Sequence, residues 1–323
     1  MLTEVMDHFG LAREPHTAGF YETPHHKRVL KGIRAALPGG RLVAVTGLVG
    51  SGKTAFMRRL CAELDREGRI TVSRSLSVDK ARITLPNLIT ALFYDMSPDK
   101  EPRIPTQGEK RERALQVLVR QGRKPVALFV DEAHDLHPKT LVGLKRLVEV
   151  VADGGGSLAV VLVGHPKLRN DLRRPTMEEI GYRTSMFAYE GVTGHQREYV
   201  AWLLCACAAA DTKLGEMIDD AAVELLATRL RTPLQIEQHL VLAFEEAFRV
   251  DVKPVTAEVV ESVLSRNMDD LEPRLVRHGY DARSVAELIG AKPGEVKLLL
   301  QGGLEAGRAR EMTEQMLVAG LPV

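Results

Sequence analysis

The feature that most constrains the fold of this chain is a glycine-rich loop between an apolar strand and a helix. Residues 47–54 read Gly-Leu-Val-Gly-Ser-Gly-Lys-Thr, the complete pattern of a phosphate-binding P-loop. The preceding residues 41–46 are mostly apolar, as a buried parallel strand requires. Residues 53–67 then place apolar side chains at helical spacing. An ordinary glycine-rich turn between a strand and a helix is the alternative. The eight-residue pattern is specific enough to favour the P-loop over it.

The residue types in the loop match the chemistry of a nucleoside triphosphate. Backbone N–H groups and the N-terminus of the following helix favour the phosphates. Lys53 is expected to reach the β- and γ-phosphates, and the Thr54 hydroxyl is expected to hold Mg²⁺. The predicted nucleotide contacts are Gly47, Val49, Gly50, Ser51, Gly52, Lys53, Thr54 and Ala55.

A second motif predicts hydrolysis. Residues 126–130 form another apolar run, and Asp131 and Glu132 follow it directly. Asp131 can hold the water shell of Mg²⁺, and Glu132 can polarise the attacking water. These acids begin 78 residues after Lys53, which leaves room for two strand–helix units. Two acids directly after a strand can also occur without any catalytic role. The prediction of hydrolysis therefore depends on finding these acids together with the P-loop.

Composition limits the remaining possibilities. The 323 residues, 45% of them hydrophobic, can bury a large core and are expected to form two or three domains. The net charge of +1 gives no global basic field, so nucleic-acid binding would need local patches. The three cysteines lack metal-site spacing and predict no disulfide framework. The sequence contains neither a signal peptide nor an apolar run of membrane-spanning length, which predicts a soluble, cytoplasmic protein without membrane contact.

The order of predicted elements indicates an α/β fold with a parallel sheet, followed by helices. A helix over 24–36 precedes strands at 41–46, 69–75, 126–130 and 157–163, which alternate with helices at 53–67, 85–95, 107–121 and 138–152. Residues 194–266 predict consecutive amphipathic helices. We therefore expect an α/β core over 1–190, a helical lid over 191–266 and a small all-α unit over 267–323.

The C-terminal unit predicts a helix, a glycine turn and a second helix over 284–300. Ala286, Gly290 and Val296 are spaced as in helix-turn-helix units, but an αα-hairpin used only for packing fits equally well. Glu295 beside Lys297 gives the second helix a poor charge balance for reading DNA. An amphipathic helix over 308–323 could pack on the core or bind a partner.

These motifs together resemble the AAA+ ATPases of the ExeA/TnsC/TniB group over about residues 1–265. This resemblance implies an AAA+ P-loop core with a helical lid, ATP and Mg²⁺ as ligands, and self-association. Residues 8–11, His-Phe-Gly-Leu, resemble the segment of that group beside the adenine, which implies a nucleotide contact for Phe9. Residues 160–168 resemble the fourth-strand block and place His165 at the sensor-1 position, beside the γ-phosphate. A surface histidine at a strand end is the alternative.

The resemblance also implies an arginine that acts on a neighbouring subunit. Arg183, which follows Tyr182, fits the position of the arginine finger, although a solvated arginine is the alternative. The lid departs from the group at its sensor-2 stretch, where Arg231-Thr-Pro-Leu-Gln235 lacks the arginine after proline. Arg231 or Gln235 could substitute for it. The departure puts nucleotide-driven cycling in doubt rather than nucleotide binding.

Two roles of this group compete. The C-terminal unit favours a transposition regulator that forms a ring or filament on duplex DNA and binds a transposase through its C-terminal region. The alternatives are a secretion-assembly ATPase like ExeA, or a nucleotide-gated DNA-binding regulator with little turnover. Candidate phosphate contacts on DNA are Lys80, Arg82 and Lys139, which lie in two basic loops.

Overall fold

The computed structural model contains two compact units. The α/β unit consists of His25–Gly47 and Lys53–Tyr189, and the helical unit consists of Met1–Pro24, Leu48–Gly52 and Glu190–Val323. The residues that the structure describes are 1–75, 83–99, 101–264 and 270–323. The expected three-part division of the chain, with boundaries near residues 190 and 266, stays a prediction.

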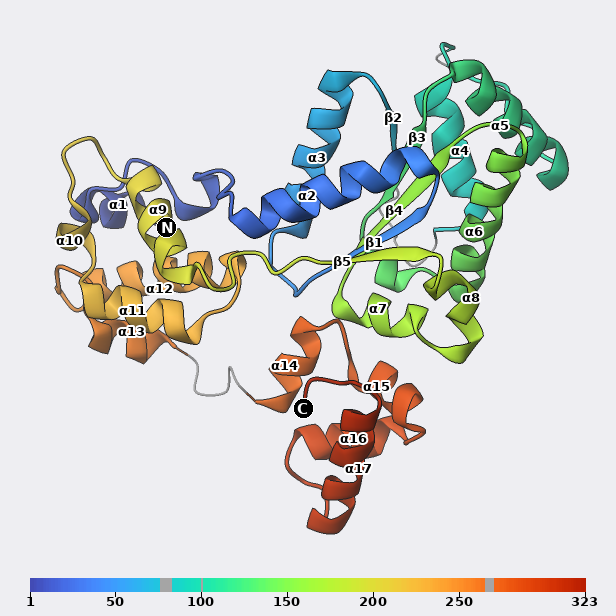
Figure 1. The fold of residues 1–323 in the computed structure, drawn as a ribbon. Helices are drawn as coiled ribbons and strands as arrows, with labels where there is room; N and C mark the ends of the chain where they lie inside the picture. The colour runs from blue at the N-terminus through green and yellow to red at the C-terminus, as the bar shows by residue number, and fades with distance from the viewer. Residues whose placement is uncertain (76–82, 100, 265–269) are drawn as a thin grey trace. The chain divides into compact units, whose positions relative to one another are not determined.

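A five-stranded parallel sheet forms the centre of the α/β unit, in the order β2-β3-β4-β1-β5 (Figure 1). The strands are β1 (Leu42–Thr46), β2 (Thr71–Arg74), β3 (Val126–Val130), β4 (Leu158–Gly164) and β5 (Thr184–Ala188). Every residue of β1, β3 and β4 is buried, as expected for the inner strands of a sheet covered on both faces. The expected α/β fold is therefore confirmed.

Helices cover both faces of the sheet. The helices of this unit are α2 (Pro24–Ala36), α3 (Lys53–Glu67), α4 (Leu85–Met96), α5 (Gly108–Gly122), α6 (Pro138–Asp153), α7 (Pro166–Leu172) and α8 (Glu178–Gly181). Alternate strand residues such as Leu128 and Val160 pack against the group α4–α8. On the other face α2 approaches β5 closely, and a Cβ atom on Gly32 would lie 2.5 Å from the Phe187 ring.

The strand β5 has no counterpart among the strands predicted from the sequence. This strand lies at an edge of the sheet and pairs only with β1, so its side chains are less buried than those of the inner strands. A half-exposed edge strand needs no continuous apolar run, which removes the signal that identified the other strands. The other four strands agree with their expected positions to within two residues at each end.

Described residues of the helical unit form two hydrophobic clusters. The first cluster joins α1 (Thr3–Phe9) to α9 (Gln196–Cys207), α10 (Leu214–Met217), α11 (Asp220–Arg229), α12 (Pro233–Arg249) and α13 (Ala257–Val263). The second cluster is formed by α14 (Leu271–Arg277), α15 (Ala282–Ile289), α16 (Pro293–Leu300) and α17 (Ala306–Val318). Among the described residues, no helix is both long enough and apolar enough to cross a membrane.

The C-terminal cluster has the expected sequence of a helix, a glycine turn and a helix. Gly290 ends α15 in the left-handed region with φ 67°, where glycine has no steric penalty. Ala286 and Val296 are buried between α15, α16 and α17. This packing fits both a helix-turn-helix unit and an αα-hairpin, so the two alternatives stay open.

Candidate nucleotide site

The site lies where the carboxyl ends of three neighbouring strands meet. In the sheet register Thr46 pairs with Gly164, and Val130 pairs with Leu162, so β1, β3 and β4 end at similar levels. Asp131 follows β3 directly, and His165 follows β4. Ligands of open α/β sheets bind at this edge because adjacent connections leave a crevice there. The register therefore brings the two sequence motifs together.

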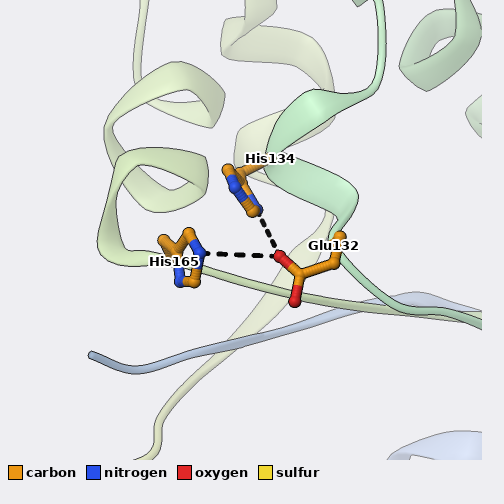
Figure 2. Close-up of side chains that lie close together, drawn as sticks. All are labelled: Glu132, His134 and His165. Carbon is orange, nitrogen blue, oxygen red and sulfur yellow. Dashed lines mark ion pairs between the residues drawn. The ribbon is translucent and has the colours of Figure 1, made fainter. Parts of the chain in front are cut away.

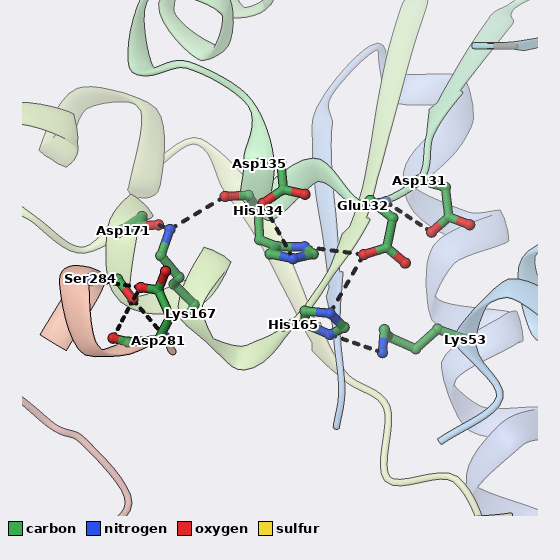
Figure 3. A network of polar contacts seen from close by, with 10 residues as sticks. All are labelled: Lys53, Asp131, Glu132, His134, Asp135, His165, Lys167, Asp171, Asp281 and Ser284. Atoms are coloured by element: carbon green, nitrogen blue, oxygen red, sulfur yellow. Dashed lines mark hydrogen bonds and ion pairs between the residues drawn. The ribbon is translucent and has the colours of Figure 1, made fainter. Parts of the chain in front are cut away.

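Thr54 and Asp131 form the oxygen-rich part of the site. The Thr54 hydroxyl donates a hydrogen bond to Asp131 Oδ2 over 3.0 Å. The other carboxylate oxygen of Asp131 accepts a hydrogen bond from the backbone N–H of Glu132 over 2.9 Å. This hydrogen bond is drawn in Figure 3. A hydroxyl and a carboxylate at this separation offer the hard oxygen ligands that Mg²⁺ prefers. Both residues belong to the α/β unit, at the start of α3 and the end of β3.

Lys53 is buried at the first position of α3, with a relative exposure of 5%. Its Nζ atom lies 3.4 Å from His165 Nδ1 (Figure 3). Burial lowers the pKa of Lys53 to about 8, although Glu132 and Asp131 favour the charged form. A phosphate group bound beside this amine would restore the preference for the charged form. The environment of Lys53 therefore suits an anionic ligand.

Glu132 has an unusual backbone that directs its side chain towards two histidines. Its φ and ψ are 54° and 36°, in the left-handed region, which costs roughly 1–2 kcal/mol for a residue with a Cβ atom. The chain then enters a 3₁₀ turn, η4 (Ala133–Asp135). Glu132 Oε2 lies 3.4 Å from His134 Nδ1 and 3.5 Å from His165 Nε2. Figure 2 shows these two ion pairs.

The two imidazoles are close together and largely buried. Their ring centroids are 3.9 Å apart, and the side chains are 10% and 13% exposed for His134 and His165. Burial is the main cause that lowers the pKa of each histidine to about 4, and Lys53 adds to the effect on both. Both rings are therefore neutral near pH 7. With Nδ1 of His165 accepting from Lys53, the ring proton lies on Nε2, which is 3.5 Å from Glu132 Oε2.

No role for His134 is predicted from the sequence. This residue lies two positions after Glu132, the second acid of the motif. Nothing in the sequence pattern predicts where its imidazole ring lies. Its position depends on the backbone turn at Glu132 and on the end of β4, which supplies His165. Both are tertiary features. The only sequence signal is a histidine soon after the acids.

Residues Leu48–Gly52 of the P-loop group with the helical unit. Gly50 and Gly52 have φ values of 74° and 91°, which favour glycine. The Leu234 N–H group donates to the Gly50 carbonyl over 3.3 Å. A Cβ atom on Gly50 would lie 2.6 Å from Leu234 Cβ, so the loop approaches the start of α12 too closely for a side chain.

The stretch that replaces sensor 2 forms the start of α12. The side-chain oxygen of Gln235 accepts the backbone N–H groups of Arg231 over 3.1 Å and of Thr232 over 3.3 Å. Gln235 and Thr232 thereby form a capping box, which stabilises the first turn of the helix. Gln235 thus has a structural task, whereas the Arg231 residue is exposed.

The remaining predicted residues lie elsewhere in the two units. Phe9 is fully buried in the first helical cluster, against Phe244, with ring centroids 4.9 Å apart. Val49, in the loop, donates its N–H group to the Arg277 carbonyl, and Ala55 is an exposed residue of α3.

Arg183 and Lys139 are exposed on the α/β unit. Arg183 follows α8, and its side chain, 61% exposed, pairs with Glu149 over 2.5 Å. Lys139 lies at the start of α6. Lys80 and Arg82 lie outside the described residues. The structure therefore brings together Lys53, Thr54, Asp131, Glu132 and His165.

Fold and site define the class of protein. Residues 38–172 match the sequence model of an AAA domain, and the five-stranded sheet has the AAA topology. This match to an AAA domain implies a site for ATP, usually with Mg²⁺. The matched range includes the P-loop, both acids and His165.

A curated relative is General secretion pathway protein A of Aeromonas hydrophila. The two sequences are 30% identical over 183 residues, which cover 54% of this chain. The same match covers only 32% of the relative, so this chain corresponds to about a third of that protein's length.

Solved structures share the fold at low sequence identity. Cdc6p from Pyrobaculum aerophilum has a TM-score of 0.54 and 17% identity, covering 98% of this chain and 84% of that one. The Drosophila ORC structure bound to DNA has a TM-score of 0.53 and 16% identity, covering 94% and 82% of the two chains. These similarities concern the fold alone.

Proposed function

We propose that this protein hydrolyses ATP, with Lys53 on the phosphates, Thr54 and Asp131 on Mg²⁺, and Glu132 polarising the attacking water. The observation that carries this proposal is the 3.0 Å hydrogen bond between Thr54 and Asp131. Two residues 77 positions apart meet there, one from each motif, and they offer the oxygen ligands that Mg²⁺ prefers. We also propose His165 as the sensor for the γ-phosphate, and its contacts with Lys53 and Glu132 support this role.

ATP binding tests the first half of this proposal. Calorimetric titration with Mg²⁺ and a slowly hydrolysed ATP analogue should show one site per wild-type chain. Lys53→Ala should abolish the binding, because it removes the buried cation that faces the phosphates. Lys124→Ala, at an exposed lysine before β3, is the matched control and should bind normally. Equal binding by both variants would contradict the proposed site.

The cellular role that we propose is an assembly ATPase of the secretion type. The similarity to General secretion pathway protein A supports this role. The aligned region of 183 residues is longer than the 135-residue match to the AAA domain, so the similarity extends beyond that domain. Deleting the gene in its own host should reduce the amount of exported protein in the medium. Wild-type protein should restore export, whereas Lys53→Ala should not. Normal export after the deletion would contradict this role.

Regulation of transposition on duplex DNA is the second candidate, and it requires the packed pair α15 and α16 to act as a helix-turn-helix unit rather than as a plain αα-hairpin. In this role the protein coats DNA as a ring or filament and binds a transposase. Fluorescence anisotropy of a labelled duplex should then rise with the ATP analogue but not with ADP, and fall with added salt. Lys139→Ala should weaken that binding. No salt-sensitive binding with any nucleotide would exclude this candidate.

Self-association belongs to both roles. We place Arg183 as the residue that one subunit offers to the nucleotide of its neighbour. Its exposure and its position after α8 support this placement, since an arginine finger must reach out of its own subunit. The pair with Glu149 would have to open for the arginine to reach a neighbour.

A further inference from the structure

Three side chains at the ends of β3 and β4 make a compact set of metal-binding donors. One donor atom from each of Glu132, His134 and His165 can be chosen so that all three lie within 4.8 Å of one another. They are one carboxylate and two imidazoles, which differ in chemistry from the hydroxyl and carboxylate of Thr54 and Asp131. Imidazole nitrogens suit Zn²⁺ and similar transition metals, whereas Mg²⁺ prefers oxygen. The three side chains point toward one another in Figure 2.

Two of the separations between these atoms match a tetrahedral ion. Bonds of about 2.0–2.1 Å at tetrahedral angles place neighbouring donor atoms about 3.3–3.4 Å apart. Glu132 Oε2 lies 3.4 Å from His134 Nδ1 and 3.5 Å from His165 Nε2. Three protein donors would leave the fourth position for water, as in zinc sites that stay open to ligands.

The surroundings of His134 support a ligand rather than a packing role. Its side chain is nine-tenths buried, and within the described parts of the chain its buried Nδ1 atom makes no hydrogen bond. The other ring nitrogen, Nε2, lies 3.6 Å from Asp135 Oδ1. A carboxylate behind a ligating histidine fixes the ring and raises its basicity. Asp135 is thus placed as the outer partner of this ligand.

We propose that Glu132, His134 and His165 bind one divalent transition-metal ion, represented by Zn²⁺, and that the bound ion stops ATP hydrolysis. The ion would hold the Glu132 carboxylate that must polarise water and the His165 ring that contacts Lys53. Metal and attacking water would therefore compete for the same carboxylate. The inhibition rests on the proposed hydrolysis, whereas the metal site itself does not.

Metal binding is tested without nucleotide. Wild-type protein, freed of metal, is titrated with Zn²⁺ against a chromogenic chelator, and with Co²⁺ while the visible absorption of a tetrahedral Co²⁺ site is followed. We expect one site per chain. Asp135→Asn should weaken it about 10–100-fold, and His134→Gln should weaken it more, because it removes a ligand. His16→Gln, at an exposed histidine of the helical unit, is the matched control. Circular dichroism verifies that each variant is folded.

Equal Zn²⁺ affinity of wild type and His134→Gln would overturn the site, as would an absence of Zn²⁺ binding. The inhibition is tested separately, at saturating Mg²⁺ and ATP, by following phosphate release against added Zn²⁺. Release should fall with the occupancy measured in the titration, and His134→Gln should need at least tenfold more Zn²⁺. If wild type binds Zn²⁺ yet no preparation hydrolyses ATP, the proposed function fails and the metal site stands. Unchanged hydrolysis at full occupancy would overturn the inhibition.

Discussion

Acidification is expected to destabilise the α/β unit through His134 and His165. Burial lowers the pKa of both imidazoles to about 4, from an ordinary value of 6.5. The unfolded chain therefore binds more protons than the folded unit between these two values. The stability that the two neutral rings contribute is complete above about pH 6.5 and is lost as the pH falls towards 4.

The size of the effect follows from the pKa difference. Within the window each histidine contributes a slope of about 1.4 kcal/mol per pH unit. Between pH 7 and pH 5 this integrates to about 2 kcal/mol for each ring, and about 3–4 kcal/mol for the pair. The contact between the rings, with centroids 3.9 Å apart, opposes protonation of both. A loss of this size is a large part of the stability of an ordinary domain.

Cys61 provides an assay that reports on this unit alone. The thiol is fully buried in α3, so it reacts only when the unit opens. The protein is labelled with a disulfide reagent that works in acid, at increasing urea concentrations and at pH 7 and pH 5. Mass spectrometry of the peptide containing Cys61 then gives the labelled fraction, from which the free energy of unfolding follows. The variant His134→Gln/His165→Asn is compared with wild type, and His16→Gln is the control.

Between pH 7 and pH 5, the free energy of unfolding should fall by about 3–4 kcal/mol more in wild type and His16→Gln than in the double variant. The comparison cancels the contribution of other groups that titrate in this range. If the double variant loses as much stability as wild type, the two histidines are not held neutral by burial, and the reasoning is wrong.

Two further predictions concern Lys53 and Arg183. Because burial lowers the pKa of Lys53 to about 8 and bound phosphate favours its charged form, ATP binding above pH 8 should take up a proton and weaken by up to about tenfold per pH unit. Calorimetry in buffers of different ionisation enthalpy measures this uptake, and a pH-independent affinity would contradict it. Separately, Arg183→Ala and Glu132→Gln should each be inactive alone but regain phosphate release when mixed, if Arg183 acts on a neighbouring subunit. A mixture as inactive as its components would exclude action in trans.

The sequence predicted the parts of the site that belong to local motifs. The P-loop pattern and the acids after 126–130 identified Lys53, Thr54, Asp131 and Glu132, and the structure brings these residues together. Their contacts follow because parallel strands end at one edge of the sheet. The roles assigned to them stay predictions, as does the nucleotide contact assigned to Phe9, which is buried in the helical unit.

What the sequence could not predict depends on tertiary structure. The place of His134 depends on the left-handed backbone of Glu132, a conformation that no residue pattern signals at a glutamate. The pair of Arg183 with Glu149 joins two residues 34 positions apart, through the packing of α6 and α8. The edge strand β5 lacks the continuous burial that makes an inner strand recognisable. In each case the deciding contact is long-range.

Single-turnover hydrolysis tests the central claim most directly. Wild type, Glu132→Gln and Glu109→Gln are each mixed in excess over radiolabelled ATP with Mg²⁺, and the release of phosphate is followed over time. Glu109 is an exposed glutamate of α5 and serves as the matched control. We predict that Glu132→Gln binds ATP but releases phosphate about 10²–10⁴-fold more slowly than the other two proteins, because it lacks the base that polarises water. Equal rates in all three proteins would contradict the account.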